Sequence, residues 1–186
     1  MVAADLKNFR NLGVSKIGQI GIVVKDIARS MEYFSGLYDV GPWYRTKLAE
    51  EEMYYRGRKI DLKLDITIAF TGGVEIELIQ VISGDENIYS SILEKQGGGV
   101  HHLGFLVTGF DRKLEAVRAM GVTPLQWGRL KTSGGAVTRF AYLDTIETCG
   151  VITEFIESKL YGVVTPHTGL LMEIGRLTGD VMRVKL

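Results

Sequence analysis

Four side chains with metal-binding chemistry occupy matched positions in two similar stretches of the chain. Gln19 in QIGIVV corresponds to His102 in HLGFLV, and Glu77 in GVEIELI corresponds to Glu154 in GVITEFI. An amide, an imidazole and two carboxylates form a nitrogen and oxygen donor set that suits a divalent cation. Two carboxylates on apolar strands would be costly to bury unpaired, and a cation would compensate them. We therefore expect one divalent metal ion at a site shared by both halves of the chain.

The matched positions belong to an internal duplication. The first pair is offset by 83 residues and the second pair by 77, so the copies differ only by small changes in loop length, which loops tolerate. An apolar stripe with helical spacing follows the first strand of each copy: Ile27, Met31, Phe34 and Leu37, then Phe110, Leu114, Val117 and Met120. The two halves are therefore expected to share one fold.

Periodicity and turn residues predict the same order of elements, βαβββ, in each copy. The first copy begins with a strand at 16–24 and a helix that starts at Asp26 and ends before Gly41-Pro42. A strand near Trp43 and Tyr44 comes next, followed by a charged loop at Lys47–Arg58. Strands at 61–70 and 73–81 and a short helix at 85–95 complete this copy. The second has a strand at 100–108, a helix at 110–120, and strands at 123–131, 136–143 and 150–157. A further helix is expected around 167–178. The predicted fold class is α+β, with these segments: lead-in 1–15, first module with connector 16–96, second module 97–158, and helical tail 159–186.

Strand alternation separates the core-facing side chains from those of the site. Ile20, Ile22 and Val24 share one face and are expected to pack under the helix, which leaves Gln19 on the opposite face. The same rule places His102 opposite the residues that pack under the second helix. A glycine follows each of them two residues later on the same face, where a missing side chain leaves room beside a ligand.

Composition excludes several function classes. Lys plus Arg and Asp plus Glu are both 22, without a basic stripe, so nucleic acid is not an expected partner. No apolar run approaches the ~20 residues that cross a bilayer, so no membrane role is expected, and the charged N-terminus does not resemble a signal peptide. A single cysteine, Cys149, excludes an internal disulfide and fits a cytoplasmic protein.

The order and spacing of IGQIGIVVKDIARSMEYF, VEIELIQV, GGGVHHLGFLV and GVITEFIES resemble the vicinal oxygen chelate superfamily. This superfamily includes glyoxalase I, methylmalonyl-CoA epimerase, bleomycin-resistance proteins and extradiol dioxygenases. The resemblance covers about residues 16–158. It implies paired βαβββ modules that form a cupped, incomplete β-barrel around one metal ion, with Gln19, Glu77, His102 and Glu154 as its ligands.

The resemblance implies an isomerase or epimerase that abstracts a proton next to a carbonyl through a metal-stabilised enediolate. GGGVHHLGF and IELIQ look particularly like the epimerase branch. Glu154 matches the base of the family, and Glu77, related to it by the internal pseudo-twofold, would reprotonate from the opposite side. Asp65 lies roughly where epimerases of the family place another carboxylate. The donor set suits Zn, Ni, Co or Mn.

Two alternatives remain open on the sequence. A Gln, Glu, His, Glu set is similar to that of glyoxalase I, a lyase on a thiol adduct, but its glutathione-binding arginines would fall at Val23 and Gly98. The other alternative is a non-catalytic small-molecule-binding protein on the same scaffold. An extradiol dioxygenase is disfavoured, because such enzymes bind Fe(II) with two His residues and one carboxylate, whereas Gln19 leaves only one imidazole.

The remaining expectations concern the substrate and the assembly. The expected partner is a small-molecule carbonyl substrate. Tyr44 and Arg45 are candidates for the mouth of its pocket, and Arg139 for gripping an anionic group. Open strand edges and the apolar tail stripe predict a homodimer, because proteins cover or pair such edges. The stripe consists of Leu170, Leu171, Ile174 and Leu177.

Overall fold

The computed structural model describes residues 12–14 and 16–186. The expected lead-in, 1–15, therefore lies almost wholly outside the described residues. The first copy contains β1 Ile17–Val23, α1 Ile27–Tyr38, β2 Tyr44–Thr46, β3 Leu48–Tyr55, β4 Arg58–Ile60, β5 Leu62–Thr71, β6 Val74–Gly84 and α2 Ser90–Gln96. The second contains β7 Gly99–Leu106, α3 Phe110–Ala119, β8 Pro124–Thr132, β9 Ala136–Leu143, α4 Ile146–Cys149 and β10 Ile152–Leu160. The tail adds β11 Val163–Val164, α5 Gly169–Thr178 and β12 Val181–Arg183.

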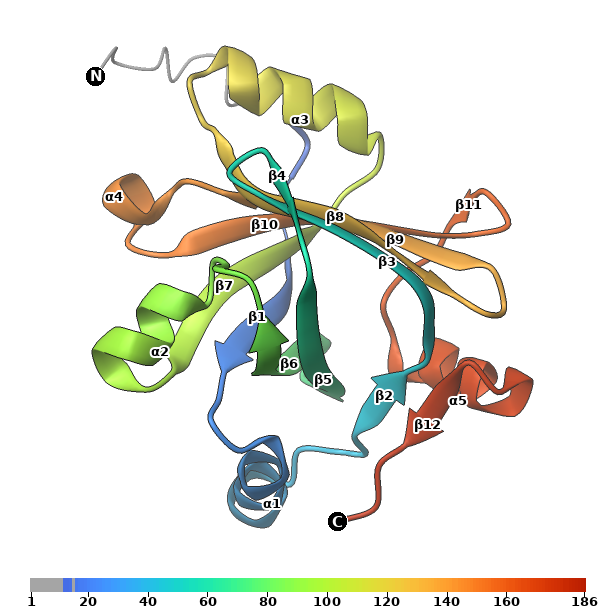
Figure 1. The fold of residues 1–186 in the computed structure, drawn as a ribbon. Helices are drawn as coiled ribbons and strands as arrows, with labels where there is room; N and C mark the ends of the chain where they lie inside the picture. The colour runs from blue at the N-terminus through green and yellow to red at the C-terminus, as the bar shows by residue number, and fades with distance from the viewer. Residues whose placement is uncertain (1–11, 15) are drawn as a thin grey trace.

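The strands of the described residues form one curled sheet rather than two separate ones (Figure 1). Its order is β12-β2-β5-β6-β1-β7-β10-β9-β8-β3-β4, with β11 paired to β10. The two copies meet where β1 pairs with β7 in antiparallel fashion. The predicted α+β fold with a cupped, incomplete barrel is confirmed.

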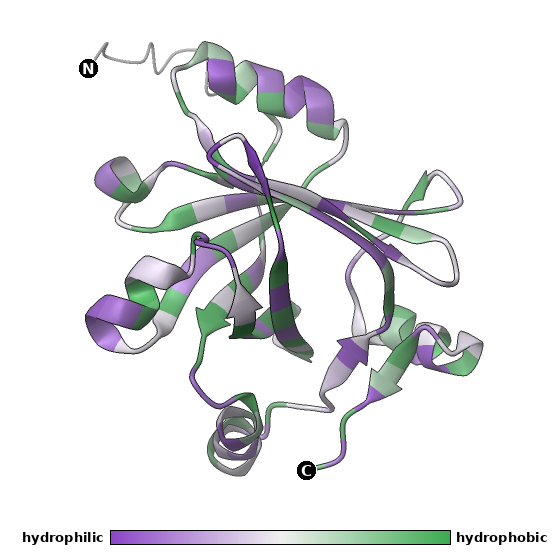
Figure 2. Ribbon diagram, viewed as in Figure 1, coloured by the Kyte–Doolittle hydropathy of each residue, from purple (hydrophilic) through white to green (hydrophobic). Residues whose placement is uncertain are grey.

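Helices α1 and α3 cover the outer surface of the sheet, each above its own module (Figure 1). Under α1, the buried side chains of Ile27 and Met31 pack with Ile76 and Leu78 of β6, and Ile20 and Ile22 of β1 join them. An equivalent cluster lies under α3. Figure 2 shows hydrophobic and hydrophilic residues alternating along β5, the pattern of a strand with two different faces. Two buried clusters therefore lie under α1 and α3. A third includes Met53, Phe140 and Tyr142, which line the cavity of the candidate site.

The charged loop expected at Lys47–Arg58 was the largest error of the secondary-structure prediction. This segment forms β3 and β4, and β3 pairs with β8 of the other module. Its acidic residues are matched there by basic ones: Glu50 contacts Lys131 at 2.6 Å and Arg129 at 3.3 Å. The strand is stabilised by a partner about 80 residues away, so local charge gave a misleading signal.

The C-terminal tail closes one side of the barrel. The helix expected around 167–178 is present as α5. The repeat pattern offered the tail no partner within its own module, and the structure pairs it with the first module. Strand β12 pairs with β2, and the hydroxyl of Tyr44 donates to Glu173 of α5 at 2.7 Å. Figure 1 shows α5 and β12 beside β2, at the opening between the two ends of the sheet. In the described part of the chain, no helix has the length and hydrophobicity of a membrane-crossing segment.

Candidate active site

Two rows of residues cross the four central strands on the inner face of the sheet. Across β6, β1, β7 and β10, the pairing register gives one row of Glu75, Gln19, Gly104 and Glu154 and another of Glu77, Gly21, His102 and Ile152. A glycine therefore stands between two polar residues in each row, and the polar side chains meet over it. This arrangement follows directly from the internal duplication.

Each glycine makes room for the polar side chain of the other module. A Cβ atom on Gly21 would lie 1.9 Å from Cε1 of His102, well inside van der Waals contact. A Cβ atom on Gly104 would lie 2.7 Å from Oε1 of Gln19. The expectation that these glycines leave space beside the site is thus met, and each space is filled by a side chain of the opposite module.

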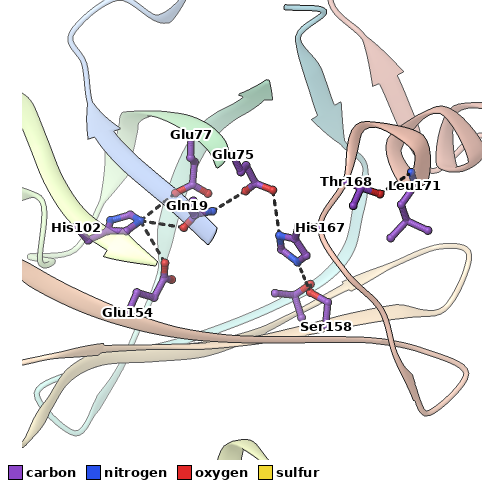
Figure 3. Close-up of polar contacts among 10 residues, drawn as sticks. Gln19, Glu75, Glu77, His102, Glu154, Ser158, His167, Thr168 and Leu171 are labelled. Carbon is purple, nitrogen blue, oxygen red and sulfur yellow. Dashed lines mark hydrogen bonds and ion pairs between the residues drawn. The ribbon is translucent and has the colours of Figure 1, made fainter. Parts of the chain in front are cut away.

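Three of the four predicted ligands converge on the fourth: Gln19, Glu77 and Glu154 all point at Nε2 of His102 (Figure 3). Oε1 of Gln19 lies 3.1 Å from this nitrogen, Oε2 of Glu154 lies 3.2 Å away, and Oε2 of Glu77 lies 3.4 Å away. The His102 side chain is fully buried, and that of Glu154 is 5% exposed. Figure 3 shows Glu77 and Glu154 on opposite sides of the His102 ring nitrogen.

Burial and charge set the protonation of this cluster. Burial alone would lower the pKa of His102, but Glu154 and Glu77 more than offset it and raise that pKa to about 9. Burial raises the pKa of Glu77, and His102 opposes this rise only in part. Burial, strengthened by His102, lowers the pKa of the neighbouring His101 to about 3, so this ring is neutral. Nδ1 of His101 lies 3.1 Å from Nδ1 of His102 and can accept a hydrogen bond from it. Nε2 of His102 then faces the carboxylates.

The donor set has the chemistry that a divalent cation needs, and its three contacts with Nε2 of His102 can be compared with the spacing of metal ligands. With bonds of about 2.0–2.2 Å, neighbouring ligands of one cation lie roughly 3–3.5 Å apart, a range that includes the three contacts of His102. Among the described residues, this buried Oε2 of Glu154 has the 3.2 Å contact with His102 but no partner in hydrogen-bond geometry. Within residues 12–14 and 16–186, however, no group of three or more His, Cys, Asp or Glu side chains is already spaced as a metal cage. The quartet is held by direct contacts, and metal binding remains a proposal.

A second chain of contacts leads from the quartet to the tail. Nε2 of Gln19 donates to Oε1 of Glu75 at 2.6 Å, and Oε2 of Glu75 lies 3.0 Å from Nδ1 of His167. Nε2 of His167 lies 2.6 Å from the hydroxyl of Ser158 on β10, which lies 2.7 Å from the hydroxyl of Thr138. Figure 3 shows His167 between Glu75 and Ser158. A residue of the tail thus reaches the inner face of the barrel.

Members of both groups line a cavity of about 660 Å³. Gln19, Glu77 and Glu154 of the quartet are among its lining residues, whereas the fully buried His102 is not. Its walls are partly apolar, with Met53, Phe140 and Ile156 from the sheet and Leu171 from α5. The size is that of a small-molecule pocket, and apolar walls with a few convergent polar groups are typical of such pockets. The cavity and the converging donor atoms together define the candidate active site.

Comparison with known sequences identifies the family. Residues 18–142, more than half of the chain, match the Glyoxalase/Bleomycin resistance protein/Dioxygenase superfamily. The chain belongs to this superfamily. The superfamily assignment confirms the resemblance that the sequence motifs indicated. An uncharacterized protein of Bacillus subtilis (strain 168), YqjC, is 24% identical over 146 residues, which cover 78% of this chain and 94% of that protein.

Solved structures of the superfamily share the fold. Hypothetical protein BH1468 from Bacillus halodurans C-125 matches with a TM-score of 0.54 and 25% identity, over 77% of this chain and 94% of that chain. Methylmalonyl-CoA epimerase from Mycobacterium tuberculosis matches with a TM-score of 0.55 and 16% identity, over 85% of this chain and 92% of that chain. A Streptomyces coelicolor methylmalonyl-CoA epimerase in complex with 2-nitronate-propionyl-CoA matches with a TM-score of 0.51 and 20% identity, over 77% and 97% of the chains. Identities this low support the fold alone for the two epimerases.

Of the four predicted substrate-binding residues, three line the cavity and the fourth, Arg139, does not. Tyr44, Arg45 and Asp65 line the cavity, but Arg45 and Asp65 are paired with each other at 2.7 Å, and Tyr44 is tied to α5. Arg139 is not among the lining residues. Its guanidinium pairs with Asp111 and lies 4.5 Å from the centre of the Phe110 ring, so it links β9 to the start of α3 instead of gripping a substrate.

Two residues of the site were missing from the predicted set. Glu75 shares a strand face with Glu77, two residues away, and this alternation was the available signal. His167 lies outside the duplication, so no matched position pointed to it. Gln80, which the alternation placed on the other face from Glu77, accepts from the backbone N–H of Ile27 at the start of α1.

Proposed function

We propose that this protein is a divalent-metal-dependent epimerase or isomerase that moves a proton next to a substrate carbonyl. The observation that carries the proposal is the pair of Glu77 and Glu154, which lie 3.4 Å and 3.2 Å from one ring nitrogen of His102 and both line the cavity. Inverting a carbon acid needs one proton-transfer group on each face of the carbon. The duplicated fold supplies such a pair by symmetry.

Gln19, Glu77, His102 and Glu154 would hold the metal ion. When bound, a divalent cation would supply Lewis-acid stabilisation of a carbonyl oxygen as that oxygen gains negative charge. One imidazole with oxygen donors suits Zn, Ni, Co or Mn. Gly21 and Gly104 allow these side chains to approach one another.

The protein groups would divide the proton transfer between them. Each carboxylate contacts His102 through Oε2, which leaves Oε1 for a proton. Glu154 would take the proton from one face of the substrate carbon, and Glu77 would return a proton from the other. In the site without a metal ion, burial raises the pKa of Glu77. The hydroxyls of Tyr89 and Tyr142, which lie 2.9 Å apart and line the cavity, stay neutral because burial raises both of their pKa values.

The substrate would be a small carbonyl compound enclosed by the cavity. The Streptomyces coelicolor epimerase binds 2-nitronate-propionyl-CoA, which makes acyl-CoA thioesters reasonable first test compounds. A cytoplasmic location and a homodimer are further proposals, and they rest on the sequence.

Metal analysis and deuterium exchange test the proposal. The purified protein should hold about one divalent cation per chain, and it should incorporate deuterium from D₂O next to the carbonyl of methylmalonyl-CoA or of another carbon acid in a panel. If two bases act, Glu77→Gln and Glu154→Gln should each still exchange one enantiomer but lose inversion. Glu94→Gln, a change on the surface of α2, is the matched control.

Two results would lead to other functions. Turnover of the hemithioacetal of methylglyoxal and glutathione, without exchange into carbon acids, would identify a lyase of the glyoxalase type. Protein without stoichiometric metal and without exchange activity, after purification free of chelators, would identify a non-catalytic binding protein.

A further inference from the structure

The tail residue His167 is connected to a proposed metal ligand through one intermediate side chain. Nδ1 of His167 contacts Oε2 of Glu75, and Oε1 of Glu75 accepts from Nε2 of Gln19. We propose that Glu75 and His167 are positioning residues that fix the amide of Gln19, so that the C-terminal tail holds a metal ligand in place. This inference rests on the proposed metal site, to which it adds two residues and a role for the tail.

The contacts of Gln19 determine which end of its amide faces the site. An ionised carboxylate can only accept hydrogen bonds, so the Nε2 end of the amide must face Glu75. Oε1 then points at Nε2 of His102, 3.1 Å away, where a cation would need an oxygen donor. A flipped amide would set its NH₂ group toward the cation and its oxygen against a carboxylate. Glu75 therefore selects the only orientation in which Gln19 can bind a metal ion.

Glu75 needs His167 in order to keep its own position. The residue is 2% exposed, and its two oxygens are divided between Gln19 and His167. Without His167, one oxygen of a buried carboxylate would lose its donor, and an unpaired buried acceptor bears its full desolvation penalty, which is larger for a charged group. Rotation of Glu75 toward another donor would release the amide of Gln19. The imidazole of His167 thus supports the ligand Gln19 through two successive hydrogen bonds, with Glu75 between them.

The tail is built to hold His167 still. The ring is fixed on its other side by Ser158 at 2.6 Å, and its side chain is only 15% exposed. The next residue, Thr168, caps α5 by accepting from the backbone N–H of Leu171 at 3.2 Å (Figure 3). Beyond α5, β12 is paired to β2. Both sides of His167 along the chain are therefore anchored to the barrel, as outer-shell support of a metal ligand requires.

Metal affinity in conservative and non-conservative variants tests the inference. His167→Asn keeps a donor near the position of Nδ1, whereas His167→Leu removes it at similar volume. Leu177→Ala changes a residue of α5, the helix that follows His167; Leu177 is 77% exposed, and this variant is the matched control. The probe is Co²⁺, with its dissociation constant measured against a competing chelator and its visible absorption spectrum as a report on the ligands.

We expect His167→Leu to weaken Co²⁺ binding by about 10–100-fold, the usual effect of losing outer-shell support. The visible spectrum should change with it, and His167→Asn and Leu177→Ala should stay within about threefold of the wild type. Glu75→Ala should behave as His167→Leu does. Unchanged affinity in His167→Leu, or equal losses in His167→Asn and His167→Leu, would overturn the inference.

A second readout separates this inference from the metal proposal. In metal-free protein, the side-chain NH₂ resonances of Gln19, assigned by their loss in Gln19→Glu, should exchange slowly with solvent because the amide is held. The exchange should become fast in His167→Leu and remain slow in His167→Asn. If the wild type binds no Co²⁺ but shows this pattern, the metal proposal fails and the positioning contact stands. Fast exchange in the wild type would overturn the positioning contact itself.

Discussion

Replacement of Gly21 by alanine should damage the site more than any other single-methyl addition to its strands. The new Cβ atom would lie 1.9 Å from Cε1 and 2.2 Å from Nε2 of His102. Carbon atoms pack at about 3.5–4.0 Å, so the imidazole would have to move by roughly 1.5 Å or more. The ring is fully buried and has Tyr142 and His101 against it, with ring centres 4.9 Å and 5.4 Å away. It has no free direction in which to move.

The expected cost has two parts. Overpacking of a buried site typically costs about 1–3 kcal/mol of unfolding free energy. Displacement of Nε2 from its three contacts at 3.1–3.4 Å should also lower metal affinity, by at least the roughly 10–100-fold seen when ligand support is lost. Urea unfolding and metal titration measure the two parts separately.

Two other glycines provide matched comparisons. Gly104→Ala would meet Oε1 and Cβ of Gln19 at 2.7 Å and 2.9 Å and Cδ1 of Ile156 at 2.9 Å. These overlaps are smaller than those on Gly21, so its effect should be smaller than that of Gly21→Ala. Gly36→Ala adds a methyl group on exposed α1, where nothing lies within 4 Å, and should stabilise the protein by about 0.5–1 kcal/mol. The reasoning is refuted if Gly21→Ala keeps wild-type stability and metal affinity, or if Gly104→Ala is the more damaging change.

For the enantiomer whose proton faces Glu154, Glu154→Gln should slow deuterium incorporation by about 10²–10⁴-fold, and a loss below tenfold would argue against Glu154 as the base. Burial and the hydrogen bond to Glu173 raise the pKa of Tyr44 to about 12, so its contribution to stability is complete below pH ~10 and declines as the pH rises toward 12. Urea unfolding between about pH 9 and 12 should therefore show a shallower loss for Tyr44→Phe than for the wild type, and parallel curves would contradict the assignment. Leu170 and Leu177 are 74% and 77% exposed, and replacing both by serine should convert the predicted homodimer to a monomer in light scattering. A wild-type monomer at high micromolar concentration would exclude the dimer.

The sequence predicted those parts of the site that repeat or alternate. The duplication paired Gln19 with His102 and Glu77 with Glu154, and strand alternation set all four on one face, where the structure brings their termini together. Strand alternation is a local pattern, and the duplication is found by comparing the sequence with itself, so both can be recognised without knowing the fold. They could also exclude His101, which lies on the other face.

The features that the sequence did not predict depend on contacts between residues far apart in the chain. Nothing near β3 in the sequence shows that β8 will pair with it, and its acidic residues are typical of a loop. His167 lies outside the repeat, and only the return of the tail across the barrel brings it to Glu75, 92 residues away. Arg139 failed as a substrate-binding candidate for the same reason, because its partner, Asp111, comes from a different element.

The pairing of β3 with β8 has a consequence for the newly made chain. Glu50 on β3 meets Lys131 on β8 across 81 residues of sequence, so β3 leaves the ribosome long before its partner strand exists. At ~5–20 residues per second, the unpaired strand waits roughly 4–16 s. During that interval it is an open edge that could pair with other chains. The run Glu50–Glu52 gives this edge three negative charges, which repel copies of itself until Arg129 and Lys131 arrive to neutralise Glu50. The acidic run thus serves as protection against aggregation first, and as an interface between the modules afterwards.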